Sequence, residues 1–331
     1  MCQRPHLFVL GSGATKATIP NGDKNGLQSP VMSELIKELE MESLLAGAKL
    51  QTSSDNIEDL YSELHKKPEY TNVVKAIENR IISHYQQMQI PDAPTLYDYL
   101  IISLREKDCI ATFNWDPLLI QAYNRVNKIT KDLPEILFLH GCVAAGLCER
   151  CNYYAPLKRQ VCPKCGEKLE MTKLLFPIKQ KDYTQNIFIK HNWNIFEDYL
   201  ERACLISIWG YSAPVSDEEA KNKMLKAFSS RFRRLDQIEL INIADESVLY
   251  NTWQPFIKET NFHVHFHKSI MDSFIAEFPR RSVEGYVKRN MEGWWDSSKV
   301  TLKNCNSFTE LATLMEPLLK NEKQKNCNVI A

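Results

Sequence analysis

Short apolar runs that end in small or polar residues constrain the fold of this chain most strongly. Stretches with helical periodicity lie between them, at 94–104, 116–124 and 187–204. Runs that are apolar without alternation are typical of parallel strands covered on both faces. The alternation therefore predicts an α/β fold, a Rossmann-like parallel sheet with helices on both faces. The predicted strands are Leu7–Leu10, Cys109–Phe113, Glu135–Leu139, Cys204–Trp209 and Gln237–Ile243.

Other parts of the chain follow different patterns. Residues 31–92 show helical periodicity and no strand-like run, which predicts a helical insertion. An amphipathic helix is expected near the C-terminus, followed by a frayed polar tail over Lys320–Asn328. We therefore expect a Rossmann domain built from 1–30, 93–146 and 172–300, the insertion at 31–92, a zinc ribbon at 147–171, and a C-terminal helix and tail at 301–331.

Charge and hydropathy exclude several classes of protein. The chain has 41 basic and 41 acidic residues, so no global field attracts nucleic acid, and direct nucleic-acid binding is not expected. Arginines at 231–234 and 280–281 are expected to lie on a solvated surface, and Trp294 and Trp295 to pack against the core or an interface. No apolar run approaches the ~18 residues that span a bilayer, and no secretory pattern opens the chain. We expect a cytoplasmic protein whose ten cysteines are reduced thiols or metal ligands.

Two CxxC pairs predict a metal site. Cys148 and Cys151 form the first pair, and Cys162 and Cys165 form the second, ten residues further on. Four thiolates can converge on a tetrahedral zinc ion, and the Pro-Lys-Cys-Gly turn leaves amides free to donate to the sulfurs. The alternatives are a pair of disulfides or four unrelated thiols. With all four positions occupied by sulfur, the zinc would be structural.

The first predicted strand runs directly into Gly11-Ser12-Gly13. A turn of this kind lets the backbone approach a diphosphate at the start of the next helix. Lys16 stands where a third glycine is usual, and no convincing acidic residue follows about twenty residues later. A simple tight turn therefore remains the alternative.

Small or polar residues also follow the other predicted strands. Because the carboxyl ends of parallel strands border the ligand crevice, their joint occurrence indicates a binding site. Each one alone could equally be a helix cap or a hydrogen bond at the edge of the core. The residues are Asn114, Asp116, His140, Gly210, Ser212 and Asn242.

In this order the motifs resemble the sirtuin-like (silent information regulator) family. Gly11–Thr15 is similar to its phosphate loop, Thr112–Asp116 to its T-Q-N-x-D motif, and His140-Gly141 to its catalytic HG, which a CxxC ribbon follows. Gly210–Ser212 is similar to its GTS segment, and Ile241-Asn242 to its ribose-binding IN pair. The resemblance implies an NAD⁺-binding Rossmann fold with a structural zinc.

One departure points to a particular branch of that family. Residues 174–183 lack the V-x-FGE strand of the acyl-lysine groove, whereas Lys181, Tyr183, Gly210–Pro214 and Asp217 are similar to the bacterial antiphage-defence branch. Members of that branch hydrolyse NAD⁺ to nicotinamide and ADP-ribose. The resemblance therefore implies an NAD⁺ glycohydrolase, an effector controlled by a separately encoded sensor protein and by homo- or hetero-oligomerisation. A protein deacylase and a non-catalytic NAD or ADP-ribose sensor are the alternatives.

Roles for the site residues follow from this chemistry. Asn114 would orient the nicotinamide ribose and a water, and His140, with an ordinary pKa near 6.5, would be the general base. Asp116 would stabilise developing positive charge or hold the carboxamide. Gly11, Ser12, Gly13, Thr15, Gly210, Ser212 and Asn242 would contact phosphate or ribose. His263, His265 and His267 lie on one predicted strand face, which is either solvated or a second metal site.

Overall fold

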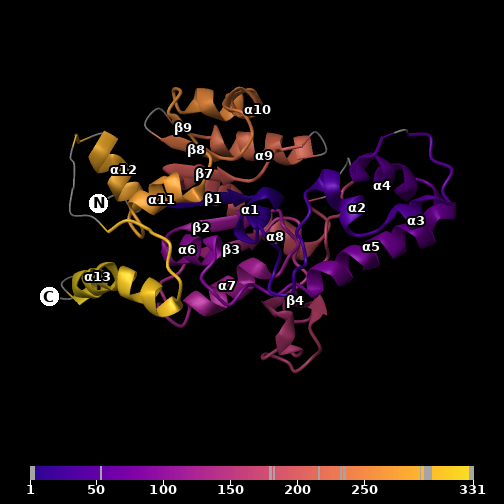
Figure 1. Cartoon of the computed structure of the whole chain (residues 1–331), viewed down its shortest axis with the longest axis horizontal. Helices are drawn as coiled ribbons and strands as arrows, with labels where there is room; N and C mark the ends of the chain where they lie inside the picture. Colours follow the sequence, from indigo (N-terminus) through magenta and orange to yellow (C-terminus); the bar gives the residue numbers. More distant parts are fainter. Residues whose placement is uncertain are drawn as a thin grey trace.

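The computed structural model describes residues 4–52, 54–178, 181, 183–214, 217–231, 233, 236–290, 292–293 and 300–327. Its centre is a six-stranded sheet of order β3-β2-β1-β7-β8-β9, in which every neighbouring pair is parallel (Figure 1). The predicted α/β fold class is confirmed. The strands are β1 His6–Leu10, β2 Cys109–Thr112, β3 Glu135–Phe138, β7 Leu205–Trp209, β8 Gln237–Ile241 and β9 Val264–His267.

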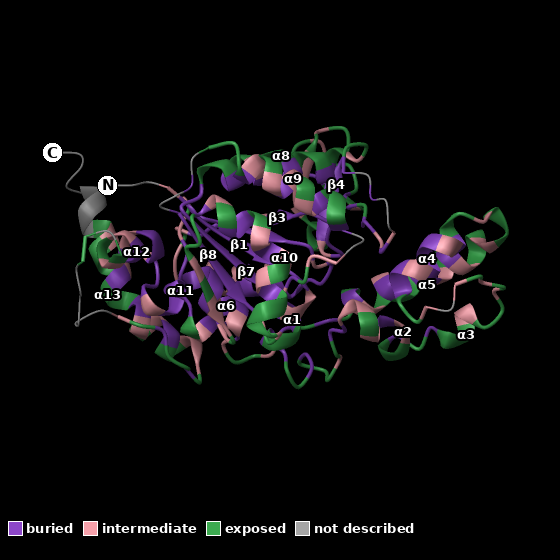
Figure 2. Cartoon of the chain, turned by 90° about the horizontal axis from the view of Figure 1, so that it is seen from above, coloured by how far each residue is buried: buried purple, intermediate pink, exposed green. Residues whose placement is uncertain are grey.

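The two faces of the sheet belong to separate hydrophobic cores. Successive side chains of a strand point to opposite faces, so Phe8 and Leu10 enter one core while Leu7 and Val9 enter the other. All four side chains are fully buried, which explains why the strand reads as a continuous apolar run. Figure 2 shows the buried strands between helices whose outer sides are exposed.

Helices cover both faces of the sheet. One layer contains α1 Ser12–Thr18, α6 Leu96–Ile102, α7 Leu118–Val126 and α13 Phe308–Cys327, and the opposite layer contains α8 Ile187–Arg202, α9 Glu218–Phe228 and α10 Glu246–Glu259. Local capping sets several helix starts. Thr95 and Asp98 form a capping box at α6, and the Asn186 side chain accepts the Ile189 amide hydrogen at α8.

The predicted helical insertion contains only helices among its described residues. These are η1 Met32–Glu34, α2 Leu35–Glu38, α3 Glu42–Leu45, α4 Ile57–His65, η2 Pro68–Tyr70 and α5 Thr71–Gln86. Figure 1 shows them together at one end of the molecule. Their buried apolar side chains, such as Tyr61 and Ile77, join the core on one face of the sheet.

The four cysteines lie in a small antiparallel module next to the sheet. Its strands are β4 Ala145–Cys148, β5 Tyr153–Pro156 and β6 Glu170–Met171 in the order β5-β4-β6, with the short helix η3 Leu157–Arg159 after β5. The module follows the end of β3 through Gly141, and on the way to α8 the returning chain passes His140, whose carbonyl accepts the Leu175 amide hydrogen at 2.9 Å.

The C-terminal region consists of η5 Ile270–Asp272, α11 Phe274–Glu277, α12 Ser282–Asn290 and α13. The prediction of a frayed tail from Lys320 was wrong for the described residues, because α13 continues to Cys327. Lys320 pairs with Glu316 one turn earlier at 2.8 Å, and Glu322 binds the buried Arg280 at 2.8 Å. These contacts extend the helix beyond its apolar stripe.

Two arginines expected on a solvated surface are buried instead. Arg233 and Arg280 are 1% and 2% exposed. Arg233 donates to the carbonyl oxygens of Leu200 and Ala203, so it stabilises the end of α8. Structural hydrogen bonds, rather than solvent or nucleic acid, satisfy these guanidinium groups. Trp294 and Trp295 lie outside the described residues.

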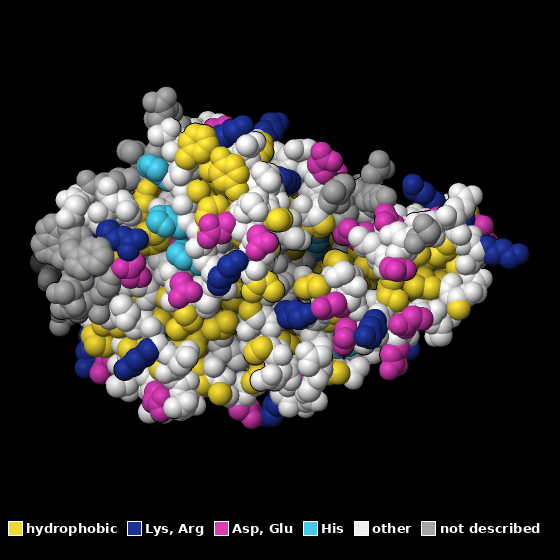
Figure 3. All heavy atoms as spheres, turned by 45° about the horizontal axis from the view of Figure 1, so that its top comes forward, with side chains coloured by type: hydrophobic (Ala, Val, Ile, Leu, Met, Phe, Trp, Pro, Cys, Tyr) yellow, Lys and Arg dark blue, Asp and Glu magenta, His cyan; other side chains and the backbone are white. Residues whose placement is uncertain are grey.

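The surface is mixed in charge on the face that Figure 3 presents, where acidic and basic side chains alternate. That arrangement agrees with the balanced composition and gives no single-sign patch on this face. Among the described residues, no helix is long and apolar enough to cross a bilayer.

Candidate active site

In parallel sheets the ligand crevice is expected where the strand order reverses, which in this chain is between β1 and β7. In this order the chain runs outward from β1 through β2 to β3, then returns to the other side of β1 as β7, so the two halves diverge between β1 and β7. The residues predicted for the site all follow the carboxyl ends of strands. Backbone hydrogen bonds continue past these ends, with Gly11 donating to Trp209, Phe113 to Leu10, Leu139 to Thr112 and Gly210 to Ile241 at 2.9–3.1 Å.

The glycine turn packs directly on the segment that follows β7. Gly210 has φ of +64°, and a Cβ at this position would lie 2.1 Å from the Ala14 amide nitrogen. Gly13 donates its amide hydrogen to the Gly210 carbonyl at 3.0 Å, and the amide of Ala14 donates to Gly11. Both donors are therefore engaged within the protein. The turn is a packed element of the crevice wall, and only glycine fits at Gly210.

Asn114 is held in place by a buried polar network. Its Nδ2 atom donates to the Gly11 carbonyl and to Thr15 Oγ1, both at 2.9 Å. Thr15 in turn donates to Asp116 Oδ2 at 2.7 Å, and Tyr97 Oη lies 2.7 Å from Thr15 Oγ1. Because Thr15 uses its hydrogen on Asp116, Tyr97 is the donor in that contact. The network fixes the amide of Asn114 at the border between β1 and β2.

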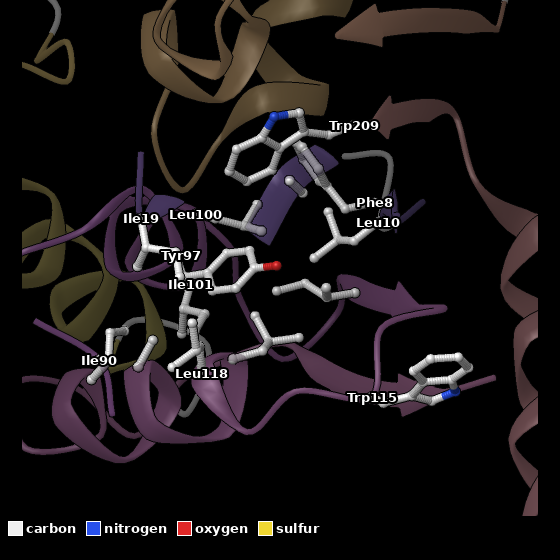
Figure 4. Close-up of a cluster of buried hydrophobic side chains, with 14 of the residues drawn as sticks. Phe8, Leu10, Ile19, Ile90, Tyr97, Leu100, Ile101, Trp115, Leu118 and Trp209 are labelled. Atoms are coloured by element: carbon white, nitrogen blue, oxygen red, sulfur yellow. The ribbon is translucent and has the colours of Figure 1, made fainter. Parts of the chain in front are cut away.

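Within this network Thr15 and Asp116 support the side chain of Asn114. Both side chains are buried, and burial raises the pKa of Asp116. Tyr97, which sequence reasoning missed, projects its hydroxyl from α6 among Leu10, Leu100 and Trp209 (Figure 4). The Asn114 Oδ1 atom accepts no hydrogen bond from any residue that the structure describes. That oxygen is therefore the part of the network available to a ligand.

His140 follows the end of the neighbouring strand β3, and the residue is 5% exposed. Its ring meets Phe113 edge-on at 4.8 Å between centroids and stacks on Tyr183 at 6.0 Å. Within the described part of the chain, neither His140 Nε2 nor Tyr183 Oη has a hydrogen-bond partner. Buried polar atoms without a protein partner usually bind water or a ligand. Gly141, with φ of +82°, lets the chain turn away from His140 close to the Lys173 carbonyl.

The expectation of an ordinary pKa for His140 was wrong. Burial lowers the pKa of His140 to about 3, with the Lys181 ammonium acting in the same direction and the Asp217 carboxylate opposing it. The imidazole is therefore neutral at physiological pH and can accept a hydrogen bond, although a pKa this low makes it a weak base.

An ion pair near His140 was also assigned no role from the sequence. Lys181 Nζ lies 2.5 Å from Asp217 Oδ1, and Tyr211 donates its hydroxyl hydrogen to Asp217 Oδ2 at 3.0 Å. The resemblance to the defence branch included Lys181 and Asp217 but assigned them no function. Their separation in sequence gives no indication that they pair.

Two predicted ligand residues stand apart from the buried network. The Ser212 side chain is exposed, and Asn242 Oδ1 accepts the Ala244 amide hydrogen at 3.0 Å. Both follow strands of the β7–β8 half of the sheet, on the opposite side of the crevice from Asn114 and His140.

The four cysteines can hold a metal ion. Their sulfur atoms all lie within 4.8 Å of one another, and a tetrahedral zinc with Zn–S bonds near 2.3 Å needs sulfurs about 3.8 Å apart. The Lys164 amide donates to Cys162 Sγ at 3.4 Å, which confirms the expected amide donors of the Pro-Lys-Cys-Gly turn. Four thiolates and a nearby amide fit structural zinc.

The expectation of a solvated face is confirmed for His263 and His265, which are exposed, whereas His267 is half-buried. The cysteine set is the one candidate metal group among the described residues, so the histidines form no such cluster there. His267 Nε2 lies 3.3 Å from Oε1 of the buried Glu239, whose other oxygen accepts from Ser207, and Ser207 Oγ lies 2.7 Å from His6 Nε2. These strands therefore carry a polar network beneath α11 and α12.

Comparisons find similar folds among solved sirtuin structures. A structure described as the basis of sirtuin substrate affinity is 16% identical, with 85% of this chain and 94% of that chain covered at a TM-score of 0.42. An ADP-ribose complex of a mutant Sir2 homologue is 15% identical (88% and 96% covered, TM-score 0.40), and a Sir2 homologue–NAD complex is 15% identical (86% and 91% covered, TM-score 0.37). No protein-family model and no curated protein sequence matches the chain. The function is therefore argued from this chain's own geometry.

Proposed function

We propose that this chain is an NAD⁺ glycohydrolase that releases nicotinamide and ADP-ribose. The observation that carries the proposal is that His140 Nε2 has no hydrogen-bond partner among the described residues, and that His140 follows β3, the strand next to β2, which Asn114 follows. Crevices at the carboxyl ends of strands in parallel sheets commonly take nucleotides. A buried acceptor nitrogen and an anchored amide oxygen on adjacent strands suit the ribose and the water of such a reaction.

The chemistry needs little acid catalysis, because the nicotinamide leaving group is already cationic in the substrate. The protein must instead hold the ribose, accommodate an oxocarbenium-like transition state and place a water. Asn114 Oδ1, fixed by the bonds that its Nδ2 makes, would accept from a ribose hydroxyl or the water. His140, kept neutral by burial, would accept a hydrogen bond without adding a positive charge beside the developing cation.

The remaining contacts with NAD⁺ would come from residues on both sides of the proposed crevice. We propose that Gly11, Ser12, Gly13 and Gly210 line the diphosphate, with Ser212 and Asn242 on the adenosine side. Thr15 and Asp116 would act through Asn114 rather than touch the substrate, because both are buried in its network. Zinc would stabilise the ribbon that follows His140 and take no part in the reaction.

Regulation is part of the proposal. An unrestrained NAD⁺ hydrolase would deplete the cell that makes it, so we propose a cytoplasmic effector of bacterial antiphage defence, activated by a separately encoded sensor protein and by homo- or hetero-oligomerisation. The balanced composition and the mixed charges on the face that Figure 3 presents give no field that would attract nucleic acid.

Product analysis tests the proposal. The chain, alone and with its genomic neighbours, is incubated with NAD⁺ and the products are separated by liquid chromatography. We expect free nicotinamide and ADP-ribose in equal amounts without any peptide, and loss of both in Asn114→Ala and His140→Ala. His65→Ala, on α4, should keep full activity. Turnover that begins only when acylated peptide is added would show a deacylase, and binding without products would show a sensor.

A further inference from the structure

A buried salt bridge ties together the segments that surround His140. Lys181 precedes α8, and Asp217 is the residue immediately before α9. Their charged side chains are only 3% and 6% exposed and lie 2.5 Å apart. Tyr211, which follows β7, holds the second oxygen of Asp217. The pair therefore connects three segments that are distant in sequence.

The same segments enclose the imidazole. Tyr183 stacks on His140, and the indole of Trp193 lies 4.6 Å from Tyr183 between centroids. Trp193 Nε1 donates to the Leu139 carbonyl at 3.1 Å, next to His140 in the chain. Phe113 meets the ring from β2 and stacks on Tyr211 at 4.2 Å. Any shift of the salt bridge would move residues in contact with His140.

Stability alone does not explain this salt bridge. Removing two charges from water costs more than their attraction commonly returns, and apolar side chains of similar size often stabilise such sites better. An ion pair in this position therefore needs another reason. Within the described part of the chain, His140 Nε2 and Tyr183 Oη have no hydrogen-bond partner, and Asp217 acts electrostatically on both groups.

The two charges act on His140 in opposite directions. Asp217 favours the imidazolium and Lys181 disfavours it, while burial keeps the ring neutral. The other two rings that face His140 are uncharged: Phe113 has no ionisable group, and burial together with Asp217 raises the pKa of Tyr183, which keeps its proton. Among the residues that the structure describes, Lys181 and Asp217 are thus the charged groups that act on the imidazole.

We propose that Lys181 and Asp217 are positioning residues, a clamp that fixes the wall behind His140 for NAD⁺ cleavage. This inference rests on the proposed function. Neither side chain needs to touch the substrate, because both act through His140. An unpaired Asp217 would favour a protonated imidazole, which cannot accept a hydrogen bond from water through that nitrogen.

Nuclear magnetic resonance of the whole chain, with ¹⁵N-labelled histidine, tests the clamp without substrate. The His140→Gln spectrum assigns His140 among the eight histidines. We expect wild-type His140, whose pKa is about 3, to stay neutral from pH 8 to pH 4. In Lys181→Met the titration midpoint should rise by about one to two pH units, so that the imidazole becomes protonated at the acid end of this range. Lys181→Arg keeps the cation and should match wild type. Lys223→Met breaks the Lys223–Glu197 pair between α9 and α8 and should leave His140 unchanged.

Kinetics supply the second readout. In Lys181→Met/Asp217→Asn, which leaves no unpaired charge, we expect kcat to fall by about tenfold or more while KM for NAD⁺ changes little, because positioning rather than binding is lost. Superimposable His140 titrations in wild type and Lys181→Met, or an equal shift in Lys223→Met, would overturn the clamp. If Lys181→Met fails to fold, an unchanged kcat in the double variant would do so. A shifted titration in a chain that never cleaves NAD⁺ would refute the proposed function and leave the clamp standing.

Discussion

Replacing Gly210 with alanine tests the packing at the point where the sheet diverges. The residue has φ of +64°, and the new Cβ would lie 2.1 Å from the Ala14 amide nitrogen and 2.4 Å from the Gly13 carbonyl carbon. Left-handed backbone costs about 1–2 kcal/mol for a residue with a Cβ. Forcing apart the two backbones adds about 1–3 kcal/mol. We therefore expect Gly210→Ala to lower the free energy of unfolding by about 2–5 kcal/mol.

Gly26→Ala is the matched control for this substitution. Gly26 also has positive φ, +84°, but a Cβ at this position would meet no described atom within 4 Å, so only the backbone strain applies. Urea denaturation followed by circular dichroism gives both free energies. The difference between the two variants isolates the clash of the Gly210 segment against the glycine turn. Equal destabilisation in both variants would refute the close packing inferred at this crevice.

Three further predictions concern the metal, pH and the network around Asn114. Cys162→Ser should release zinc, measured by mass spectrometry of bound metal, while the remote Cys305→Ser retains it; a full zinc complement in Cys162→Ser would exclude a four-thiolate site. Burial lowers the pKa of His6 and of His140 to about 3, below the unfolded value of 6.5, so the unfolded chain binds more protons between these pH values. The free energy of unfolding should consequently fall by roughly 1.4 kcal/mol per histidine for each pH unit below 6.5, and a flat profile between pH 6.5 and 5 would contradict this. Tyr97→Phe removes the hydroxyl that donates to Thr15 and should lower the free energy of unfolding by about 1 kcal/mol in urea denaturation, whereas an unchanged value would contradict the role of Tyr97 in this network.

The sheet could be predicted because its strands are buried on both faces. Leu7–Leu10 and Cys204–Trp209 are apolar at nearly every position, and the structure has strands at His6–Leu10 and Leu205–Trp209. The carboxyl ends of these strands lie along one edge of the sheet because all its strands run in the same direction. The juxtaposition of Asn114 with the glycine turn followed from that rule.

Side-chain contacts between residues of different strands could not be predicted. His6, Ser207 and Glu239 come from β1, β7 and β8, and their contact depends on a strand order that local sequence does not encode. The same holds for Lys181 and Asp217, which two loops bring together. The pKa of His140 was mispredicted because desolvation depends on the aromatic rings packed around it, which belong to other segments.

A crystal structure of the chain with ADP-ribose tests the central claim most directly. We expect the diphosphate beside Gly11 and Gly210, and the ribose that had carried nicotinamide within hydrogen-bond distance of Asn114 Oδ1 or His140 Nε2. ADP-ribose bound elsewhere, with both of these atoms facing only solvent or protein, would contradict the account.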